Sequence, residues 1–381
     1  MRLSTSSGYV FQSREGRRQD RPMARHLGDS TEVAVLVRLT IAPPAWAVSE
    51  KFARLTMAMS TSVMSRGLAA AGAWRFLTMA GQCIAEARPS VLGVHLIRFA
   101  AGAGAGARIA GRLHLGAAVA GAVTWEMAIF AIYLLNGVMD VHEDRVNGSR
   151  RPIASGALPR RVAAWWAAGA AAVSVACALA EGTPRSAAVI VVLALGWQYS
   201  ASPGALKRRV AGVAVVGAAL GFSAYFVGFT SQAGSDWSHP ASGPIAFAIT
   251  MSAWMAFIGA PAKDLSDVPG DAAAGRRTLP VLWGEAATRR GIAVAAVVIA
   301  VAFCAAATYD PRLLRWPAAT VAAGASSIAL LSLTRTAAGS RLPYKCFMLT
   351  QYAANICMLL ATAALLGHRH AVIDRFEGRS A

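Results

Sequence analysis

Two clusters of acidic side chains, far apart in the sequence, have the spacing of a divalent-metal site. In the first, Asn136, Asp140 and Asp144 recur every four residues, so on a continuing helix they would share one face. Like charges at this spacing repel one another unless a cation lies between them. Mg²⁺ prefers oxygen ligands and is commonly held by one or two carboxylates together with substrate phosphate oxygens. The first cluster therefore suits a Mg²⁺ ion that bridges to a diphosphate.

The second cluster consists of Asp264, Asp267 and Asp271. Asp264 and Asp267 lie three residues apart and can share a helical face. Pro269 and Gly270 are expected to turn the chain, so that Asp271 approaches from a loop. Either cluster alone is also compatible with a solvated loop or a helix cap. Two such clusters, each following an apolar segment and each beside Lys or Arg, favour metal binding.

Basic and hydroxyl side chains accompany the acidic clusters. The connection at 198–209 contains Tyr199, Lys207 and Arg208, and Lys263 directly precedes the second cluster. Cations at these positions can neutralise diphosphate oxygens and stabilise the diphosphate as a leaving group. The alternative is a basic helix end held at a membrane surface. We predict that Lys207, Arg208 and Lys263 are catalytic.

The composition indicates that membrane helices position these clusters. Of the 381 residues, 56% are hydrophobic and only 15% are charged, whereas a soluble domain carries about a quarter charged residues. From Arg88 onward, apolar stretches of roughly 18 to 25 residues recur, each long enough to cross a bilayer as a helix. Nine spans are predicted, near 89–107, 114–135, 162–181, 185–202, 210–232, 241–261, 290–308, 313–334 and 346–367.

The spans are expected to be helices because they lack the two-residue alternation of barrel strands. Small residues, such as the run from Ala100 to Ala107, permit close contacts between helices. Residues 1–87 are expected to form an extension, poorly ordered or interfacial, before a domain at 88–370 and a tail at 371–381. Five scattered cysteines show neither zinc spacing nor a disulfide framework.

The distribution of basic residues predicts the orientation. Lys and Arg are concentrated in the connections after the second, fourth, sixth and eighth spans. Because basic loops are retained on the cytoplasmic side, both acidic clusters are expected to face the cytoplasm from the plasma membrane. The net charge of +18 does not indicate nucleic-acid binding, since the basic residues form no continuous face interleaved with aromatic residues. Membrane lipids are the expected surroundings.

Three segments, in this order, resemble the UbiA superfamily of intramembrane prenyltransferases. They are Asn136-xxx-Asp140-xxx-Asp144 followed by Arg151-Pro152-Ile153-Ala154-Ser155-Gly156; Tyr199-Ser200 with Pro203 and Leu206-Lys207-Arg208; and Lys263-Asp264-xx-Asp267-xxx-Asp271 with Gly275 and Thr278-Leu279-Pro280. The resemblance covers about 88–367. One departure is Gly137, where many members have a second acidic residue directly after the Asn.

The resemblance implies an all-α membrane protein, a bundle of nine transmembrane helices around a central cavity with both acidic motifs at its cytoplasmic mouth. It implies Mg²⁺-dependent transfer of an isoprenyl group from an isoprenyl diphosphate to an aromatic or other lipophilic acceptor. The metal ligands would be Asn136, Asp140, Asp144, Asp264, Asp267 and Asp271. The substrate-binding residues would be Tyr199, Arg151, His95 and Arg98.

Polar groups within the predicted spans are costly in lipid and tend to face cavities. His95 and Arg98 are the leading candidates, followed by Glu126, Gln351 and Asn355. Aromatic side chains that are placed to guide an isoprenyl chain or to stabilise a cation are Tyr225, Phe226, Trp254 and Phe257. Lipid contact or core packing is the alternative for these aromatic residues.

Two other functions are compatible with the same motifs. A terpene cyclase would use the same acidic residues without an acceptor. A cation-coupled transporter would also need buried carboxylates, but it usually places them near the membrane midplane on broken helices, whereas these acids lie at the ends of spans. Neither the acceptor, the donor chain length nor the oligomeric state follows from the sequence.

Overall fold

A computed structural model describes residues 73–233, 242–334 and 340–377. Within these ranges the chain is helical and forms no strand, with only an isolated bridge between Arg209 and Arg277. The first 72 residues of the predicted extension lie outside the described residues. The long helices are α3 (Pro89–Ala110), α4 (Leu115–Met139), α7 (Arg160–Glu181), α8 (Thr183–Ser200), α9 (Val210–Ala233), α10 (Ser242–Trp254), α13 (Leu279–Ala307), α14 (Pro311–Leu333) and α15 (Leu342–Glu377). The short helices are α5 (Val141–Val146), α6 (Pro152–Ser155), η1 (Leu206–Arg208), η2 (Met255–Gly259), α11 (Ala260–Asp264) and α12 (Val268–Ala273).

Eight helical segments in the described ranges are long and apolar enough to cross a membrane. They match eight of the nine predicted spans, including 242–264, where α10 continues through the π-helical turn η2 into α11. The remaining predicted span, near 185–202, is helix α8. It contains Arg185 near its start and Gln198 near its end, and it is not among the eight helices that are apolar enough to count as spans. The all-helical fold is confirmed, and the ninth span stays a prediction.

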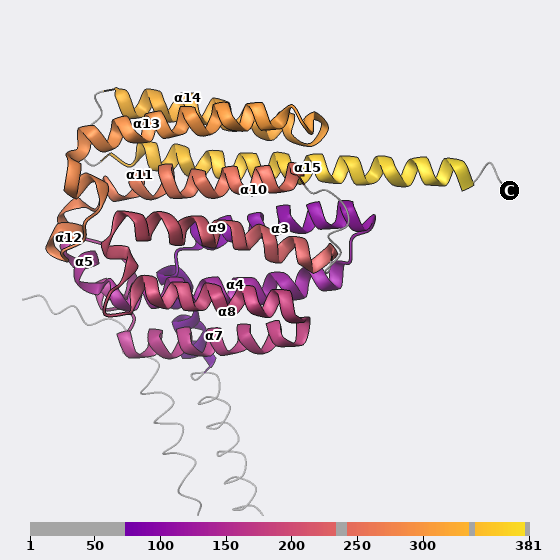
Figure 1. Ribbon diagram of the computed structural model, residues 1–381. Coiled ribbons are helices and arrows are strands. Elements are labelled where there is room, and N and C mark those ends of the chain that lie inside the picture. Colours follow the sequence, from indigo (N-terminus) through magenta and orange to yellow (C-terminus); the bar gives the residue numbers. More distant parts are fainter. Residues whose placement is uncertain (1–72, 234–241, 335–339, 378–381) are drawn as a thin grey trace, which may run out of the picture. The chain divides into compact units, whose positions relative to one another are not determined.

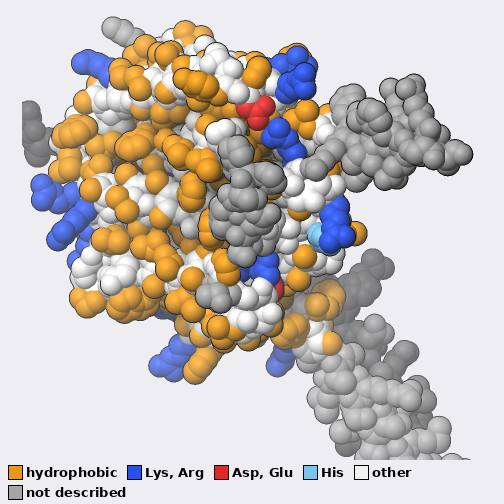
Figure 2. Space-filling view, turned by 45° about the vertical axis from the view of Figure 1, so that its right-hand side comes forward, with side chains coloured by type: hydrophobic (Ala, Val, Ile, Leu, Met, Phe, Trp, Pro, Cys, Tyr) orange, Lys and Arg blue, Asp and Glu red, His pale blue; other side chains and the backbone are white. Residues whose placement is uncertain are grey.

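The outer surface of the bundle suits lipid. Large hydrophobic side chains are exposed on outward faces, such as Trp165 on α7 (78% exposed) and Val301 on α13 (64%). Figure 2 shows a face dominated by hydrophobic side chains, with most Lys and Arg side chains toward its margins. Extended apolar surfaces of this kind mark contact with a membrane or a partner.

Small residues allow α3 and α9 to approach closely, and the run from Ala100 to Ala107 predicted such a contact without indicating its partner. A Cβ atom on Gly102 would lie 2.1 Å from the backbone oxygen of Tyr225, and one on Gly228 would lie 2.0 Å from that of Phe99. Any side chain at either position would therefore push the two helices apart. This contact fixes one wall of the interior.

The motif-bearing connections meet at one end of the bundle. Figure 1 shows α5 and α12 side by side at that end. The backbone N–H of Gly270 in α12 donates to Oδ1 of Asn147, directly after α5, at 2.8 Å. The backbone N–H of Arg277 donates to the oxygen of Arg208 in η1 at 2.9 Å. Three connections that are distant in sequence are thus joined.

Several boundaries differ from the sequence prediction. Cys83 and Glu86 are fully buried in the bundle, so the end of the predicted extension is packed against the domain. Helix α13 begins at Leu279, well before the predicted start at residue 290. A bend at Gly284, whose φ is 78°, separates its first residues from the rest of the helix. Helix α15 continues to Glu377, so the predicted tail at 371–381 begins inside a helix.

Candidate active site

A cavity of about 160 Å³ lies between α3, α4, α8, α9 and the helix formed by α10, η2 and α11. Since roughly 10–15 Å³ suffices for one water molecule, it has room for a larger ligand. Eight of the predicted site residues line it: His95, Arg98, Asn136, Asp140, Tyr199, Lys207, Lys263 and Asp264. The other five do not: Asp144, Arg151, Arg208, Asp267 and Asp271. The π-helical turn contributes Met255 and Gly259 to the wall.

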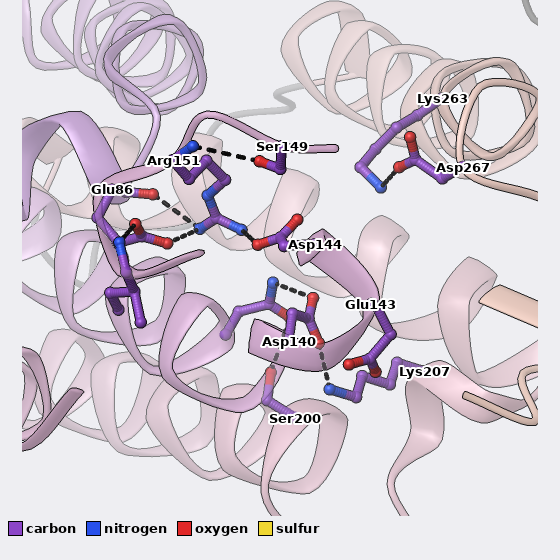
Figure 3. Close-up of polar contacts among 12 residues, drawn as sticks. Glu86, Asp140, Glu143, Asp144, Ser149, Arg151, Ser200, Lys207, Lys263 and Asp267 are labelled. Carbon is purple, nitrogen blue, oxygen red and sulfur yellow. Dashed lines mark hydrogen bonds and ion pairs between the residues drawn. The ribbon is translucent and has the colours of Figure 1, made fainter. Parts of the chain in front are cut away.

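Asp140 is the centre of the charged end of this cavity (Figure 3). Its Oδ1 accepts hydrogen bonds from Lys207 Nζ and from Arg276 Nη2, the latter at 2.6 Å. Its Oδ2 accepts one from Asn136 Nδ2 at 2.8 Å, and Ser200 Oγ donates to Asn136 Oδ1 at 3.1 Å. Burial alone would raise the pKa of Asp140, but Arg276 and Lys207 lower it to about 2. Asp140 is therefore an anion at neutral pH.

The first acidic cluster, Asn136, Asp140 and Asp144, does not lie on one uninterrupted helix. Helix α4 ends at Met139 and α5 begins at Val141, with Asp140 between them. The backbone N–H of Asp140 still donates to Asn136 O, and that of Asp144 to Asp140 O, at 2.9 and 2.8 Å. The four-residue spacing thus survives the break. The carboxylates nevertheless have different partners, because Asp144 is bound by Arg151 at 2.6 Å.

Arg151 is held between Asp144 and Glu86 (Figure 3). Its Nη2 lies 2.7 Å from Glu86 Oε1 and also donates to the Glu86 backbone oxygen at 2.8 Å. The other carboxylate oxygen of Glu86 accepts the backbone N–H of Ile153 at 2.9 Å. Burial lowers the pKa of Arg151 below its ordinary value, with a further contribution from Arg88. Arg151 therefore supports the first motif from outside the cavity.

Glu86 also accounts for the unusual Gly137. A Cβ atom at position 137 would lie 2.3 Å from Glu86 Oε1 and 2.7 Å from Arg151 Nη2. The carboxylate of Glu86 thus occupies the space that a side chain after Asn136 would enter. Glu86 was absent from the predicted site because it lies before the first apolar span, among residues assigned to the extension.

The second acidic motif is built differently from the prediction. Asp271 does not enter from a turned loop, because Val268–Ala273 form helix α12, which accommodates Pro269 in its first turn. Lys263 Nζ donates to Asp267 Oδ2 at 2.6 Å, and Ser266 Oγ donates to Asp267 Oδ1 at 2.9 Å. Burial would raise the pKa of Asp267, but Lys263 lowers it.

Arg276 connects the two motifs and was missing from the predicted site. Its guanidinium contacts Asp140 at 2.6 Å and both Glu143 Oε1 and Asp271 Oδ1 at 3.3 Å. Burial opposes the charge of Arg276, yet these acids, with Asp140 foremost, raise its pKa above the ordinary value. The signal in the sequence was a cation five residues after Asp271. Arg208, by contrast, is exposed, and its backbone oxygen makes the contact to Arg277.

Other candidates are distributed around the interior. Gln351 and Asn355 are fully buried outside the cavity lining, and Glu126 also lies outside it. Trp254 is buried and Phe257 is 54% exposed, and neither residue lines the cavity. The alternative of core packing for Trp254 and lipid contact for Phe257 fits these positions. Tyr225 and Phe226 line a second, apolar cavity of about 240 Å³ between α3, α9 and α10. Further cavity residues absent from the predicted site are Arg88, Thr278, Tyr344 and Phe347.

A family model described as the UbiA prenyltransferase family matches residues 96–366. The chain belongs to this family. It is 30% identical over 207 residues to the digeranylgeranylglyceryl phosphate synthase of Methanopyrus kandleri, a match that covers 54% of this chain and 72% of that one. It is 35% identical over 239 residues to the enzyme of the same name from Halobacterium salinarum, covering 60% and 78%.

Solved structures of UbiA homologues share the fold. The homologue from Archaeoglobus fulgidus bound to DMAPP and Mg²⁺ superposes with a TM-score of 0.60 at 18% identity, covering 75% of this chain and 99% of that one. The same homologue bound to GPP and Mg²⁺ gives a TM-score of 0.59 over the same shares at 18% identity. The protein is accordingly a prenyltransferase with membrane-spanning helices, as the three motifs predicted.

The UbiA-type site has a donor set that fits Mg²⁺. Asn136, Asp140 and Asp264 present oxygen atoms to one cavity, and the buried Oδ2 of Asp271 has no hydrogen-bond partner among the described residues. In the same ranges, no three His, Cys, Asp or Glu side chains are gathered into a metal site. Mg²⁺ is typically held by one or two carboxylates and completed by substrate phosphates. The site therefore fits an ion that arrives with a phosphorylated substrate.

Proposed function

We propose that this UbiA-family prenyltransferase transfers an isoprenyl group from an isoprenyl diphosphate to a lipophilic acceptor in a Mg²⁺-dependent reaction. The observation that carries the proposal is a single cavity with a charged end and apolar walls. Asp140, Lys207 and Arg276 line the charged end, and Val94, Ile132, Val216 and Leu220 are among the apolar lining residues. An isoprenyl diphosphate is likewise divided into a charged diphosphate and an apolar hydrocarbon chain. The solved homologue from Archaeoglobus fulgidus is bound to GPP and Mg²⁺ or to DMAPP and Mg²⁺, which supports the choice of Mg²⁺ as cofactor.

Mg²⁺ bound by Asn136, Asp140 and Asp264 would supply Lewis-acid stabilisation of the diphosphate. Lys207 and Arg276, which now both donate to Asp140 Oδ1, have the donors to bind diphosphate oxygens as well. When the allylic C–O bond breaks, its electron pair stays with the diphosphate, and these cations stabilise the growing negative charge. Lys263 lines the same cavity and adds a third cation.

The apolar walls protect the allylic cation. Val94, Ile132 and Leu220 are all buried and all line the cavity. Exclusion of water from this region prevents hydrolysis of the cation. The nucleophilic atom of the acceptor then forms a bond to C1 of the isoprenyl group and gives up its proton. We propose that Tyr199, which lines the cavity beside Ser200, orients the substrate near the charged end.

The test uses the full chain in nanodiscs with labelled geranyl, farnesyl and geranylgeranyl diphosphates. We expect Mg²⁺-dependent consumption of a donor that EDTA abolishes and that Asp140→Asn or Asp264→Asn, which alter two cavity-lining carboxylates, reduces at least a hundredfold. Asp310→Asn is the matched control, because Asp310 pairs with Arg108 outside the cavity. Undiminished activity in EDTA contradicts the proposal. Hydrocarbon or terpene alcohol formed without an acceptor would instead identify a cyclase.

We also propose that the charged end faces the cytoplasm from the plasma membrane, since the Lys- and Arg-rich connections lie there. In a chain without its five native cysteines, Gly204→Cys is expected to react with an impermeant maleimide only after inside-out vesicles are prepared. Tyr309→Cys, which alters a residue 88% exposed between α13 and α14, is expected to react from the other side. The reverse labelling pattern would show the opposite orientation.

A further inference from the structure

The two cavities of the bundle follow one another along α3 and α9, which both begin at the end that bears the motifs. On α3, the lining of the first cavity reaches Arg98 and that of the second begins at Ala101. On α9, the lining of the first reaches Leu220 and that of the second begins at Phe222. The second cavity therefore lies beyond the first, farther from the diphosphate end. Five aromatic side chains line it: Phe222, Tyr225, Phe226, Phe229 and Phe247.

A layer of hydrogen-bonded side chains separates the two cavities. The guanidinium of Arg98 donates a hydrogen bond to the Tyr225 hydroxyl, and its Nη1 lies 2.9 Å from Met255 Sδ. The Tyr225 hydroxyl donates to Asn355 Oδ1 at 2.8 Å, and Asn355 Nδ2 donates to the backbone oxygen of Gln351 at 2.8 Å. Arg98 lines the first cavity and Tyr225 lines the second. The layer thus crosses the bundle from α3 through α9 to α15.

Tyr225 is held in this layer from three directions. Its hydroxyl is engaged both as an acceptor and as a donor. Its ring meets that of Phe247 edge-on, with a centroid distance of 5.6 Å and an interplanar angle of 80°. Its backbone oxygen packs so closely against α3 that a Cβ atom on Gly102 would lie 2.1 Å away. Rotation of the ring would leave buried polar groups unpaired, which is unfavourable in an apolar interior. The layer is therefore a fixed partition between the cavities.

The first cavity is small for an isoprenyl chain. Its volume is about 160 Å³, and an apolar protein cavity of about 150 Å³ holds one benzene molecule. Space of this size therefore accommodates about six carbon atoms, close to one five-carbon isoprene unit. A chain of four isoprene units exceeds it and would have to pass the layer that contains Arg98 and Tyr225. The second cavity, of about 240 Å³, would offer room for roughly ten more carbon atoms on the same scale.

We propose that Arg98 and Tyr225 form the floor of the donor site and restrict the enzyme to short isoprenyl diphosphates, dimethylallyl or geranyl. The inference rests on the proposed function and specifies its donor class. Tyr225 determines the limit, because it contacts Arg98 on one side and lines the second cavity on the other. Removal of its ring would take away the support beneath Arg98 and join the two cavities. The distal units of a longer chain could then enter the aromatic-lined space.

Displacement of labelled geranyl S-thiolodiphosphate from the full chain in nanodiscs with Mg²⁺ tests this floor, because binding of the unreactive analogue needs no acceptor. The competitors are the dimethylallyl, geranyl and geranylgeranyl analogues. For the wild type, the geranylgeranyl analogue should bind at least about tenfold more weakly than the geranyl analogue. Tyr225→Ala should shift the ratio of the two Kd values by at least about tenfold toward the geranylgeranyl analogue, since burial of two further methylene groups already corresponds to about that factor. Ala248→Leu, which narrows the second cavity, should remove this gain when added to Tyr225→Ala.

Two controls separate the floor from a general structural role. Tyr225→Phe keeps the ring and should keep the wild-type ratio within about threefold. Tyr352→Ala removes the same type of side chain from α15 at a position that lines neither cavity, and it should leave the ratio within about twofold. Equal binding of the geranyl and geranylgeranyl analogues to the wild type overturns the proposal, even if Tyr225→Ala does not fold. An unchanged ratio in folded Tyr225→Ala overturns it as well. Failure of the proposed function would appear separately, as absence of Mg²⁺-dependent turnover of every donor.

Discussion

Replacement of Glu86 by Ala is expected to loosen the support of the first acidic motif. Glu86 is 0% exposed and Arg151 is 13% exposed, and their side chains are 2.7 Å apart. Removal of one partner of a buried ion pair costs about 3–5 kcal/mol, because the other charge remains buried. Arg151 keeps its contact with Asp144, which favours the lower value. Ile153 N–H, however, also loses its acceptor. We expect a loss of about 3 kcal/mol.

Thermal unfolding of the detergent-solubilised full chain measures this loss. At about 2 °C per kcal/mol, as in larger domains, the melting temperature should fall by roughly 6 °C. Because Arg151 then holds Asp144 less firmly, the Mg²⁺ concentration for half-maximal activity should rise about tenfold. Asp310→Ala is the matched control. It removes a pair with Arg108 in which both side chains are partly exposed, 33% for Arg108 and 23% for Asp310, and such a pair is worth under about 1 kcal/mol.

A second substitution tests the relation to Gly137. In the Glu86→Ala background, Gly137→Asp places a carboxylate where the Glu86 group was, with its Cβ 2.7 Å from Arg151 Nη2. The double variant should recover part of the stability and of the Mg²⁺ dependence, whereas Gly137→Asp alone should destabilise the chain. The reasoning is refuted if Glu86→Ala unfolds within 1 °C of the wild type, or if the double variant is no better than Glu86→Ala.

Three further predictions follow from the site and the packing. Arg276→Gln should lower kcat by about 10²–10³-fold, as expected for loss of a group that stabilises developing charge. Arg208→Gln should leave kcat within twofold, because the Arg208 side chain is exposed. Equal effects of the two substitutions on kcat in a steady-state assay would contradict the assignment of Arg276. In metal-free protein, the lowered pKa of Asp140, about 2 against an ordinary 3.8, implies about 2 kcal/mol of stability. This contribution is present above about pH 4 and is lost as the pH falls through about 2, so the difference in melting temperature between wild type and Asp140→Asn should narrow from pH 5 to pH 2.5. Gly102→Val should lower the free energy of unfolding by about 1–3 kcal/mol through overpacking, because its Cβ would lie 2.1 Å from Tyr225 O. Gly169→Val is the control. A Cβ atom at position 169 meets nothing within 4 Å, so this variant should change the melting temperature far less.

Much of the fold was predictable because its signals are local. Apolar length alone located the membrane helices, and the four-residue spacing of Asn136, Asp140 and Asp144 survives even where the helix breaks. Small residues on α3 predicted a close helix contact, but they did not indicate that α9 is the partner. The helical state of α12 was harder to predict, since Pro269 and Gly270 are typical of turns, yet a Pro in the first helical turn needs no backbone donor.

The sequence by itself determined the helical class, the family and the oxygen-rich motifs, because hydropathy and short spacings depend on neighbouring residues. The tertiary structure decided which charges meet. Asp140 is paired with Lys207, 67 residues away, and with Arg276, 136 residues away, while Arg208, adjacent to Lys207, points outward. Glu86 reaches Arg151 only because the segment that contains Cys83 and Glu86, directly before α3, is buried in the bundle. Burial and the choice of partner depend on packing between distant segments, which no local pattern encodes.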